Sequence, residues 1–308
     1  MTTAAPTGPA ASASRAGGGR AGTTGVPRRV GRPRARRRKS GARGIALTAL
    51  TWGIALLFVS PALWMVLTAF KQEGDAATDP PTVLFEPTLE RFGGVVDSGI
   101  LPYLANSMVA TLVSTSLVLL LGVPAAYALS IRPIKRTQDA LFFFISTKML
   151  PVVAVVVPLY VAAAQVRMLD NVWTLVVLYT AMNLPIAVWM LRSFFLEVPK
   201  GIVEAAQMEG AGLPRVLWSV MLPVMAPGIA ATALICMIFS WNEFFFAVNL
   251  TAVQAATAPV FMVGFITSEG LFLAQLSAAA TLVSLPIVVV GWIAQRQLVR
   301  GLSMGAVK

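Results

Sequence analysis

The sequence predicts an all-α protein that crosses a membrane six times. Of its 308 residues, 57% are hydrophobic and only 12% are charged, whereas a soluble domain carries about 25% charged residues. Six stretches are long and apolar enough to span a bilayer as helices, which takes about 20 residues each. The composition therefore argues against a soluble enzyme and against a disordered chain.

The predicted spans, in order, cover residues 45–69, 106–129, 141–164, 172–195, 223–250 and 274–294. They are too long and too continuously apolar for the alternating strands of a membrane barrel. Prolines lie inside or near most spans, and we expect them to kink the helices without breaking them. The first span is longer than a signal-peptide core and is followed by no small-x-small cleavage site, so we expect it to remain in the protein.

The basic residues are unevenly placed. Residues 1–43 hold 11 of the 24 Lys and Arg and none of the 13 Asp and Glu. This segment is rich in small residues and Pro, which predicts a disordered basic tail before a membrane domain over 44–308. Because the tail ends at the first span, we expect its partners to be anionic lipid headgroups and not nucleic acid.

The same residues predict the orientation. In a six-span chain, both termini and the loops at 130–140 and 192–222 fall on one side and carry 20 Lys and Arg. The other side carries Lys71, Arg91 and Arg167, and Lys148 lies inside a span. By the positive-inside rule, both termini face the cytoplasm and the 69–105 loop faces outward from the cell membrane.

No catalytic or metal site is predicted. The chain has no His and one cysteine, Cys236, so it cannot form a His- or Cys-cluster metal site or use a His base. It also lacks paired carboxylates and the Gly-x4-Gly-Lys-Ser/Thr phosphate loop. We therefore expect no cofactor in this chain.

The loop between the fourth and fifth spans, 197–222, has a pattern of its own. Pro199 suits a first helical turn, and residues 202–209 predict a short helix that Gly210 and Gly212 end. Pro214 is expected to open a second short helix. Two short helices separated by glycines predict a knob that projects from the membrane.

The residues of this loop resemble a known motif. The spaced set is Glu204-Ala205-Ala206, Gly210, Val220 and Leu222-Pro223. It is similar to the EAA loop of ABC importer permeases, including its place before the fifth of six spans. It differs in having Val220 where Ile is usual and Glu209 where Asp is common.

The resemblance implies a role for each part of the loop. The first short helix would dock in a cleft on an ATPase subunit, where Glu204 makes a charge-assisted contact, Ala205 and Ala206 allow close approach, and Gly210 sets the turn. Leu222-Pro223 would lead into the fifth span. The alternative for this loop is an interfacial amphipathic helix with no partner.

The resemblance also implies an assembly of bacterial type. The chain would pair with a second permease subunit, with two ATP-binding cassette subunits that hold ATP and Mg²⁺, and with an extracytoplasmic solute-binding protein. Residues 146–151, 241–244 and 298–308 look closest to maltose-type carbohydrate permeases. Within that group, 146–149, 179–185, 268–272 and 276–279 resemble permeases for the sugar alcohols mannitol and glucitol.

Polar residues inside the spans are candidates for the translocation path, because they are costly in lipid and need a reason to be there. They are Asn183, Trp241, Asn242 and Glu243. Alternatively, Asn242 and Glu243 cross-link helices or lie in the outer headgroup zone of the membrane, since Glu243 is about 30 Å of helix rise past Pro223. Lys148 is expected to reach back toward the cytoplasmic face.

Two other functions compete with an ATP-driven permease. A stand-alone secondary transporter or channel would show internal inverted repeats, and we find no convincing repeat. An integral membrane enzyme would need clustered catalytic groups, which the sequence lacks.

Overall fold

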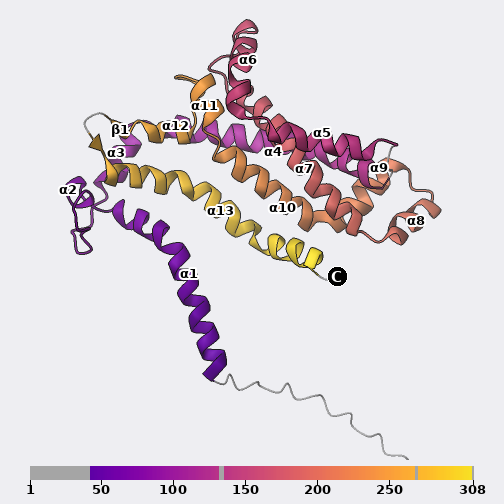
Figure 1. The fold of residues 1–308 in the computed structure, drawn as a ribbon, viewed down its shortest axis with the longest axis horizontal. Coiled ribbons are helices and arrows are strands. Elements are labelled where there is room, and N and C mark those ends of the chain that lie inside the picture. The colour runs from indigo at the N-terminus through magenta and orange to yellow at the C-terminus, as the bar shows by residue number, and fades with distance from the viewer. Residues whose placement is uncertain (1–41, 132–134, 268–269, 307–308) are drawn as a thin grey trace, which may run out of the picture. The chain divides into compact units, whose positions relative to one another are not determined.

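The structure is a computed structural model that describes residues 42–131, 135–267 and 270–306. The predicted disordered basic tail over 1–43 lies almost wholly outside these residues. The described part is helical (Figure 1), which confirms the predicted all-α class. The helices are α1 (Ala42–Thr68), α2 (Glu73–Ala76), α3 (Glu90–Asp97), α4 (Ile100–Ser130), α5 (Thr137–Met149), α6 (Val152–Gln165), α7 (Val172–Glu197), α8 (Lys200–Met208), α9 (Leu213–Arg215), a π-helix (Val216–Met221), α10 (Leu222–Trp241), α11 (Phe245–Leu250), α12 (Ala258–Val263) and α13 (Leu273–Ala306).

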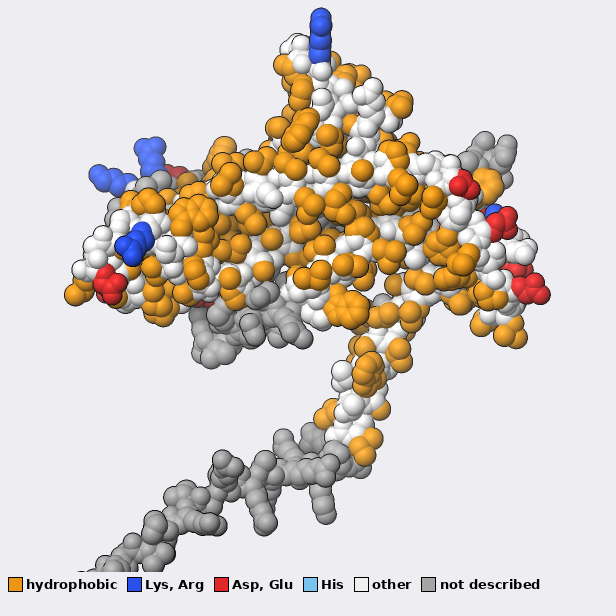
Figure 2. Space-filling model, turned by 180° about the vertical axis from the view of Figure 1, so that it is seen from behind, with side chains coloured by type: hydrophobic (Ala, Val, Ile, Leu, Met, Phe, Trp, Pro, Cys, Tyr) orange, Lys and Arg blue, Asp and Glu red, His pale blue; other side chains and the backbone are white. Residues whose placement is uncertain are grey.

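The only strands in the described segments are two short ones next to α13. β1 (Ile266–Thr267) and β2 (Gly270–Leu271) pair antiparallel, with Ile266 opposite Leu271. In the described residues, five helical segments are long and apolar enough to cross a membrane, and the bent pair α5 and α6 adds a sixth if the pair is counted as one broken span. Hydrophobic side chains cover most of the face seen in Figure 2.

The chain divides into two compact units at Ile54. The described part of the first unit is the beginning of α1, whose apolar side chains are exposed all round, as a helix surrounded by lipid requires. The second unit holds the remaining helices. In it α4 packs along α7, and α10 contacts α4, α7 and α13.

The predicted third span is interrupted. α5 ends at Met149, α6 begins at Val152, and the two axes differ by 90°. Leu150 precedes Pro151, a position that disfavours the helical conformation, and both residues are extended. The expectation that prolines only kink the spans is wrong at this point, although Pro124 and Pro185 lie inside unbroken helices.

The predicted fifth span, 223–250, ends earlier than expected. α10 ends at Trp241, and a turn separates it from α11. The carboxylate of Glu243 accepts hydrogen bonds from the backbone N–H groups of Phe246 and Ala247. These bonds satisfy donors at the start of a new helix, which explains why the chain turns here although it remains apolar.

Candidate functional site

The helix α8 is built by its own sequence. Pro199 occupies the position before Lys200, the first residue of α8. Glu204, Ala205 and Gln207 are good helix formers. The side chains then divide between two faces: Val203 and Ala206 are buried, three residues apart on one face.

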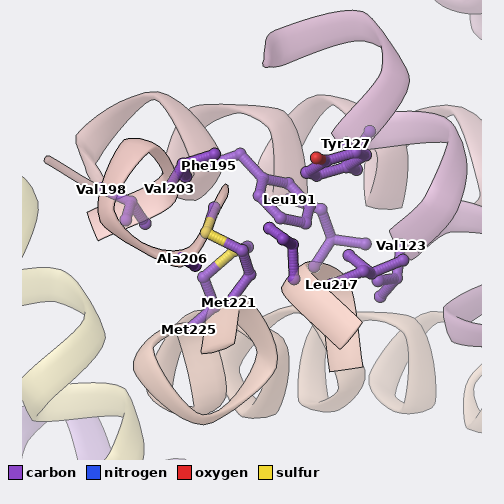
Figure 3. Packing of buried hydrophobic residues seen from close by; sticks show 12 residues of the cluster. Val123, Tyr127, Leu191, Phe195, Val198, Val203, Ala206, Leu217, Met221 and Met225 are labelled. Carbon is purple, nitrogen blue, oxygen red and sulfur yellow. The ribbon is translucent and has the colours of Figure 1, made fainter. Parts of the chain in front are cut away.

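The buried face of α8 sits in a hydrophobic cluster at one end of the helix bundle (Figure 3). Tyr127 and Phe195 meet edge-on in this cluster, with ring centroids 5.7 Å apart. Its buried members besides Val203 and Ala206 are Val123, Ala126, Tyr127, Leu191, Phe195, Val198, Val216, Leu217, Met221 and Met225. They come from α4, α7 and the residue after it, the π-helix and α10, and α8 itself packs mainly against the π-helix Val216–Met221.

The exposed face of α8 carries Glu204, Ala205, Gln207 and Met208. Met208 is 89% exposed, and exposed methionines are frequent on protein-binding surfaces. Ala205 is therefore exposed and Ala206 buried, about 100° apart around the helix axis. Ala205 is accessible to a partner protein, whereas Ala206 packs in the hydrophobic cluster of its own chain.

The end of α8 is a Schellman motif, which explains the spacing between Ala206 and Gly210. The N–H of Ala211 donates to the carbonyl of Ala206, and the N–H of Gly210 donates to the carbonyl of Gln207, both at 3.0 Å. Gly210 has a φ of 78°, a left-handed conformation that glycine adopts at little cost. A glycine four positions after Ala206 is what this helix end requires.

The second short helix that Pro214 was predicted to open is not separate from the fifth span. α9, the π-helix and α10 form one continuous helical segment from Leu213 to Trp241. Val220 and Leu222 pack against the cluster under α8, and Pro223 lies in the first turn of α10. The Val220-x-Leu222-Pro223 part of the motif thus packs the start of the fifth span against the hydrophobic cluster under α8.

A hollow of about 450 Å³ lies beside α8, at the end of α4. Ser130 of α4 and Lys200, Glu204 and Gln207 of α8 contribute its polar lining. This hollow exposes Glu204 from the side and gives a partner room to approach it.

Two of the predicted path residues are buried within this chain. Asn183 is fully buried, and its amide donates to the carbonyl of Tyr179 at 3.0 Å and to Oγ of Ser240 at 2.9 Å. Ser240 lies 3.3 Å from Oγ of Ser114, so the three side chains connect α4, α7 and α10. Trp241 is also buried, and its indole N–H donates to the carbonyl of Val283 in α13.

The other two predicted path residues lie in the turn after α10. Asn242 is exposed, and its amide donates to the carbonyl of Ile238 one turn earlier. Glu243 is half-buried and caps α11 through its carboxylate. Asn183 and this turn are neighbours, because Asn183 bonds to Ser240 and the hydroxyl of Tyr179 donates to the carbonyl of Glu243.

Lys148 has a neighbour that the sequence did not predict. Its side chain is exposed, and its Nζ lies 5.8 Å from the ring centroid of Phe239, near the end of α10. The two residues are far apart in the sequence, so no local pattern could have paired them.

A second polar arrangement that the sequence did not reveal involves Asp170, between α6 and α7. Its carboxylate accepts hydrogen bonds at 2.9–3.1 Å from four successive backbone N–H groups, those of residues 252–255. Partial burial raises the pKa of Asp170, but these donors outweigh that effect and lower the pKa to about 2. In the described residues, no three of His, Cys, Asp and Glu gather to hold a metal ion.

Comparison with known proteins gives a consistent result. Residues 118–304 match the family model described as binding-protein-dependent transport system inner membrane component. The chain is 40% identical over 264 residues to a probable ABC transporter permease protein, y4oR, of Sinorhizobium fredii, covering 85% of this chain and 95% of that protein. It is 33% identical to the trehalose transport system permease protein SugB of Mycobacterium tuberculosis, covering 85% and 96%.

The fold also resembles solved structures. The chain matches a chain of a bacterial ABC transporter involved in the import of the acidic polysaccharide alginate, with a TM-score of 0.68 at 21% identity, covering 85% of this chain and 98% of that one. A chain of the MetNI methionine ABC transporter matches with a TM-score of 0.54 at 18% identity, covering 67% of this chain and 97% of that one. At these identities the likeness concerns the fold.

Proposed function

Since the chain belongs to the family of inner membrane components of binding-protein-dependent transport systems, we propose that it couples the hydrolysis of ATP to transport. The ATP is hydrolysed in a partner subunit, and the transported solute is a carbohydrate. The chain is a permease subunit of an ABC importer. Its sequence contains no phosphate-binding loop, and ATP is hydrolysed in partner subunits.

The observation that carries the coupling role is the two-sided structure of α8. One face packs against the π-helix at the start of the fifth span, in a cluster that α4, α7 and α10 share, and the other is exposed with Glu204, Ala205 and Met208. A partner that moves α8 therefore moves the π-helix and, through it, the start of α10, because close-packed side chains transmit displacement. In this proposal Glu204 makes a charge-assisted contact with the ATPase, Ala205 permits close approach, and Gly210, Leu222 and Pro223 hold the helix in place.

The proposed assembly contains a second permease subunit, two ATP-binding cassette subunits that bind ATP and Mg²⁺, and an extracytoplasmic solute-binding protein. Closure of the two ATPase subunits shifts the permease pair between inward-facing and outward-facing states. Such a shift needs partner contacts that differ between the two states.

We further propose that the carbohydrate is a sugar alcohol. Support comes from the sequence stretches 146–149, 179–185, 268–272 and 276–279, which resemble mannitol and glucitol permeases. Three relatives that are 31–33% identical to this chain are named as permeases of trehalose, diacetylchitobiose and sulfoquinovosyl glycerol systems. The broader class of proposed solutes is therefore carbohydrates and their derivatives.

The test uses the exposed face of α8, where a substitution leaves the packed cluster intact. Glu204→Arg should reduce ATPase co-purification and uptake at least tenfold, because it reverses the charge at the contact. Glu204→Gln should have a milder effect, since it keeps the shape and part of the hydrogen bonding. Both variants should be present in the membrane at the wild-type level.

Asn242→Ala serves as the control, because Asn242 is exposed at the far end of α10. It should leave ATPase association unchanged whatever it does to uptake. Normal association and normal uptake by Glu204→Arg would contradict the coupling role of Glu204 on α8.

A further inference from the structure

Lys148 lies near the end of α5, inside the predicted third span. It is seven residues after Leu141, where that span begins, which corresponds to about 10 Å of helix rise. The apolar core of a bilayer is about 30 Å thick. We therefore expect the Cα of Lys148 to lie inside the apolar core.

The ammonium group of Lys148 has an aromatic partner and no acidic one. Its Nζ lies 5.8 Å from the centroid of the Phe239 ring, on α10. In the described residues the only ion pair is Arg91 with Glu90, so no carboxylate of this part of the chain neutralises Lys148. Cation–π attraction to Phe239 compensates for part of the missing hydration.

Both side chains are exposed on the surface of this chain. A charged side chain at this depth faces the bundle interior or a water-filled cavity and not lipid, because lipid would leave it without hydration. The face that carries Lys148 and Phe239 is thus covered by water or protein in the assembled importer.

A hollow of about 380 Å³ opens next to Lys148, under the bend between α5 and α6. Thr147 and Lys148 line it together with apolar residues that include Met182 and Phe246. Phe239 does not line this hollow and is connected to it only through its contact with Lys148. The size of the hollow lies in the range of small-molecule sites, which are mostly apolar with a few polar groups.

Resting on the proposed function, we infer that Lys148 and Phe239 form a solute contact on the translocation path, and that the solute is a neutral polyhydroxylated molecule. The ammonium donates hydrogen bonds to hydroxyl oxygens, and the aromatic ring packs against the C–H groups of the carbon chain. The solute need not be an anion, because the ring already supplies the ammonium with an electrostatic partner.

The first experiment measures exposure to water and protection by solute. Cys236 is the chain's single cysteine and is buried, so Cys236→Ala gives a background for Lys148→Cys, Phe239→Cys and Phe143→Cys. Phe143 is exposed on α5, about 140° around the helix from Lys148, and is the matched lipid-facing control. The complete importer in membranes is treated with a charged methanethiosulfonate.

Cysteines at positions 148 and 239 should react at least ten times faster than a cysteine at 143. Mannitol, glucitol or trehalose, whichever the wild-type importer takes up, should slow the first two reactions at least fivefold and leave the third unchanged. Equal rates at the three positions, or no protection, would overturn the inference.

The second experiment separates hydrogen bonding from charge. Lys148→Gln keeps a donor and should retain uptake within about fivefold, whereas Lys148→Met should lose at least tenfold. Both should keep normal association with the ATPase and the second permease. Wild-type uptake by Lys148→Met, or loss of the second permease from the complex, would overturn the inference, the latter by showing that Lys148 pairs with that subunit.

Glucuronate distinguishes an anionic solute. Faster wild-type uptake of glucuronate than of the neutral solutes, with equal loss in both Lys148 variants, would contradict a neutral class. All these comparisons require that the wild-type importer takes up the solute in an ATP-dependent manner. Absence of that uptake would count against the proposed function, and its presence with negative results at Lys148 counts against this inference alone.

Discussion

At the scale of single residues, Gly210 is fixed by backbone geometry. Its φ of 78° is unfavourable for any residue with a Cβ, while no atom lies within 4 Å of the place that a Cβ would occupy. Gly210→Ala should therefore strain the end of α8 by about 1–2 kcal/mol. Hydrogen–deuterium exchange of the segment 206–212 should become about 5–30 times faster.

The matched control is Gly201→Ala, in the same helix. Gly201 is also free of neighbours and has no positive φ, so alanine there should leave α8 unchanged or slightly more stable. Equal exchange rates in the two variants would show that the left-handed helix end does not limit the stability of α8.

Asp170 has a comparable role for a loop outside the spans. Asp170→Asn keeps the size but removes the charge that accepts four backbone hydrogen bonds, and we expect a loss of about 1–2 kcal/mol in the stability of the 251–257 loop. The pKa of Asp170 is about 2 in the folded chain, against about 3.9 for an unperturbed Asp. Its contribution is complete above about pH 4 and disappears as the pH falls toward 2.

The measurement is the rate of proteolysis at the 251–257 loop in wild type and variant. The variant should be cut about 5–30 times faster between pH 5 and pH 7, and the difference should be constant over that interval. A difference that changes between pH 5 and pH 7 would contradict the low pKa of Asp170.

At the scale of elements, the sequence predicted helices better than their interruptions. The span predicted at 172–195 agrees with α7, because Asn171 caps its start by accepting a hydrogen bond from the N–H of Trp173. The breaks at Pro151 and at Glu243 were missed because hydrophobicity continues across them. The sequence also could not show which of Ala205 and Ala206 is buried, because only tertiary packing distinguishes two adjacent alanines.

The contact between α7 and α10 depends on a second glycine. A Cβ on Gly228 would lie 2.5 Å from the ring of Phe194, which is too close for the two helices to keep their positions. Gly228→Ala should lower the free energy of unfolding by about 1–3 kcal/mol. The melting temperature of the purified protein in detergent should fall accordingly.

The double variant Gly228→Ala with Phe194→Leu identifies the cause, because a smaller side chain at 194 makes room for the new methyl group. A coupling energy of at least about 0.5 kcal/mol between the two changes is expected. Strict additivity would mean that Phe194 can move away freely and that the contact does not set the helix spacing.

At the scale of the whole molecule, contacts between loops agree with a six-span topology. Asp170 lies between the third and fourth predicted spans and binds the loop that follows the fifth. Glu73 lies after the first span, and its carboxylate accepts hydrogen bonds from Ala274 and Gln275, at the start of the last. The C-terminal ends of α4 and α7 and the start of α10 meet in the hydrophobic cluster under α8. Loops expected on the same side of the membrane thus meet one another.

The loops that meet one another form two groups, one on each side of the membrane. Because Lys and Arg are concentrated in the group that includes α8, we predict that α8 and both termini face the cytoplasm. In the Cys236→Ala background, Val253→Cys places a thiol in the 251–257 loop, and Met208→Cys places one on the exposed face of α8. Both positions are more than 80% exposed, so accessibility within the chain does not favour either. An impermeant maleimide added to intact cells should label position 253 at once and position 208 only after the membrane is opened. The reverse pattern would put α8 outside the cell, where no ATP-hydrolysing subunit could reach it, and the coupling role of Glu204 would have to be abandoned.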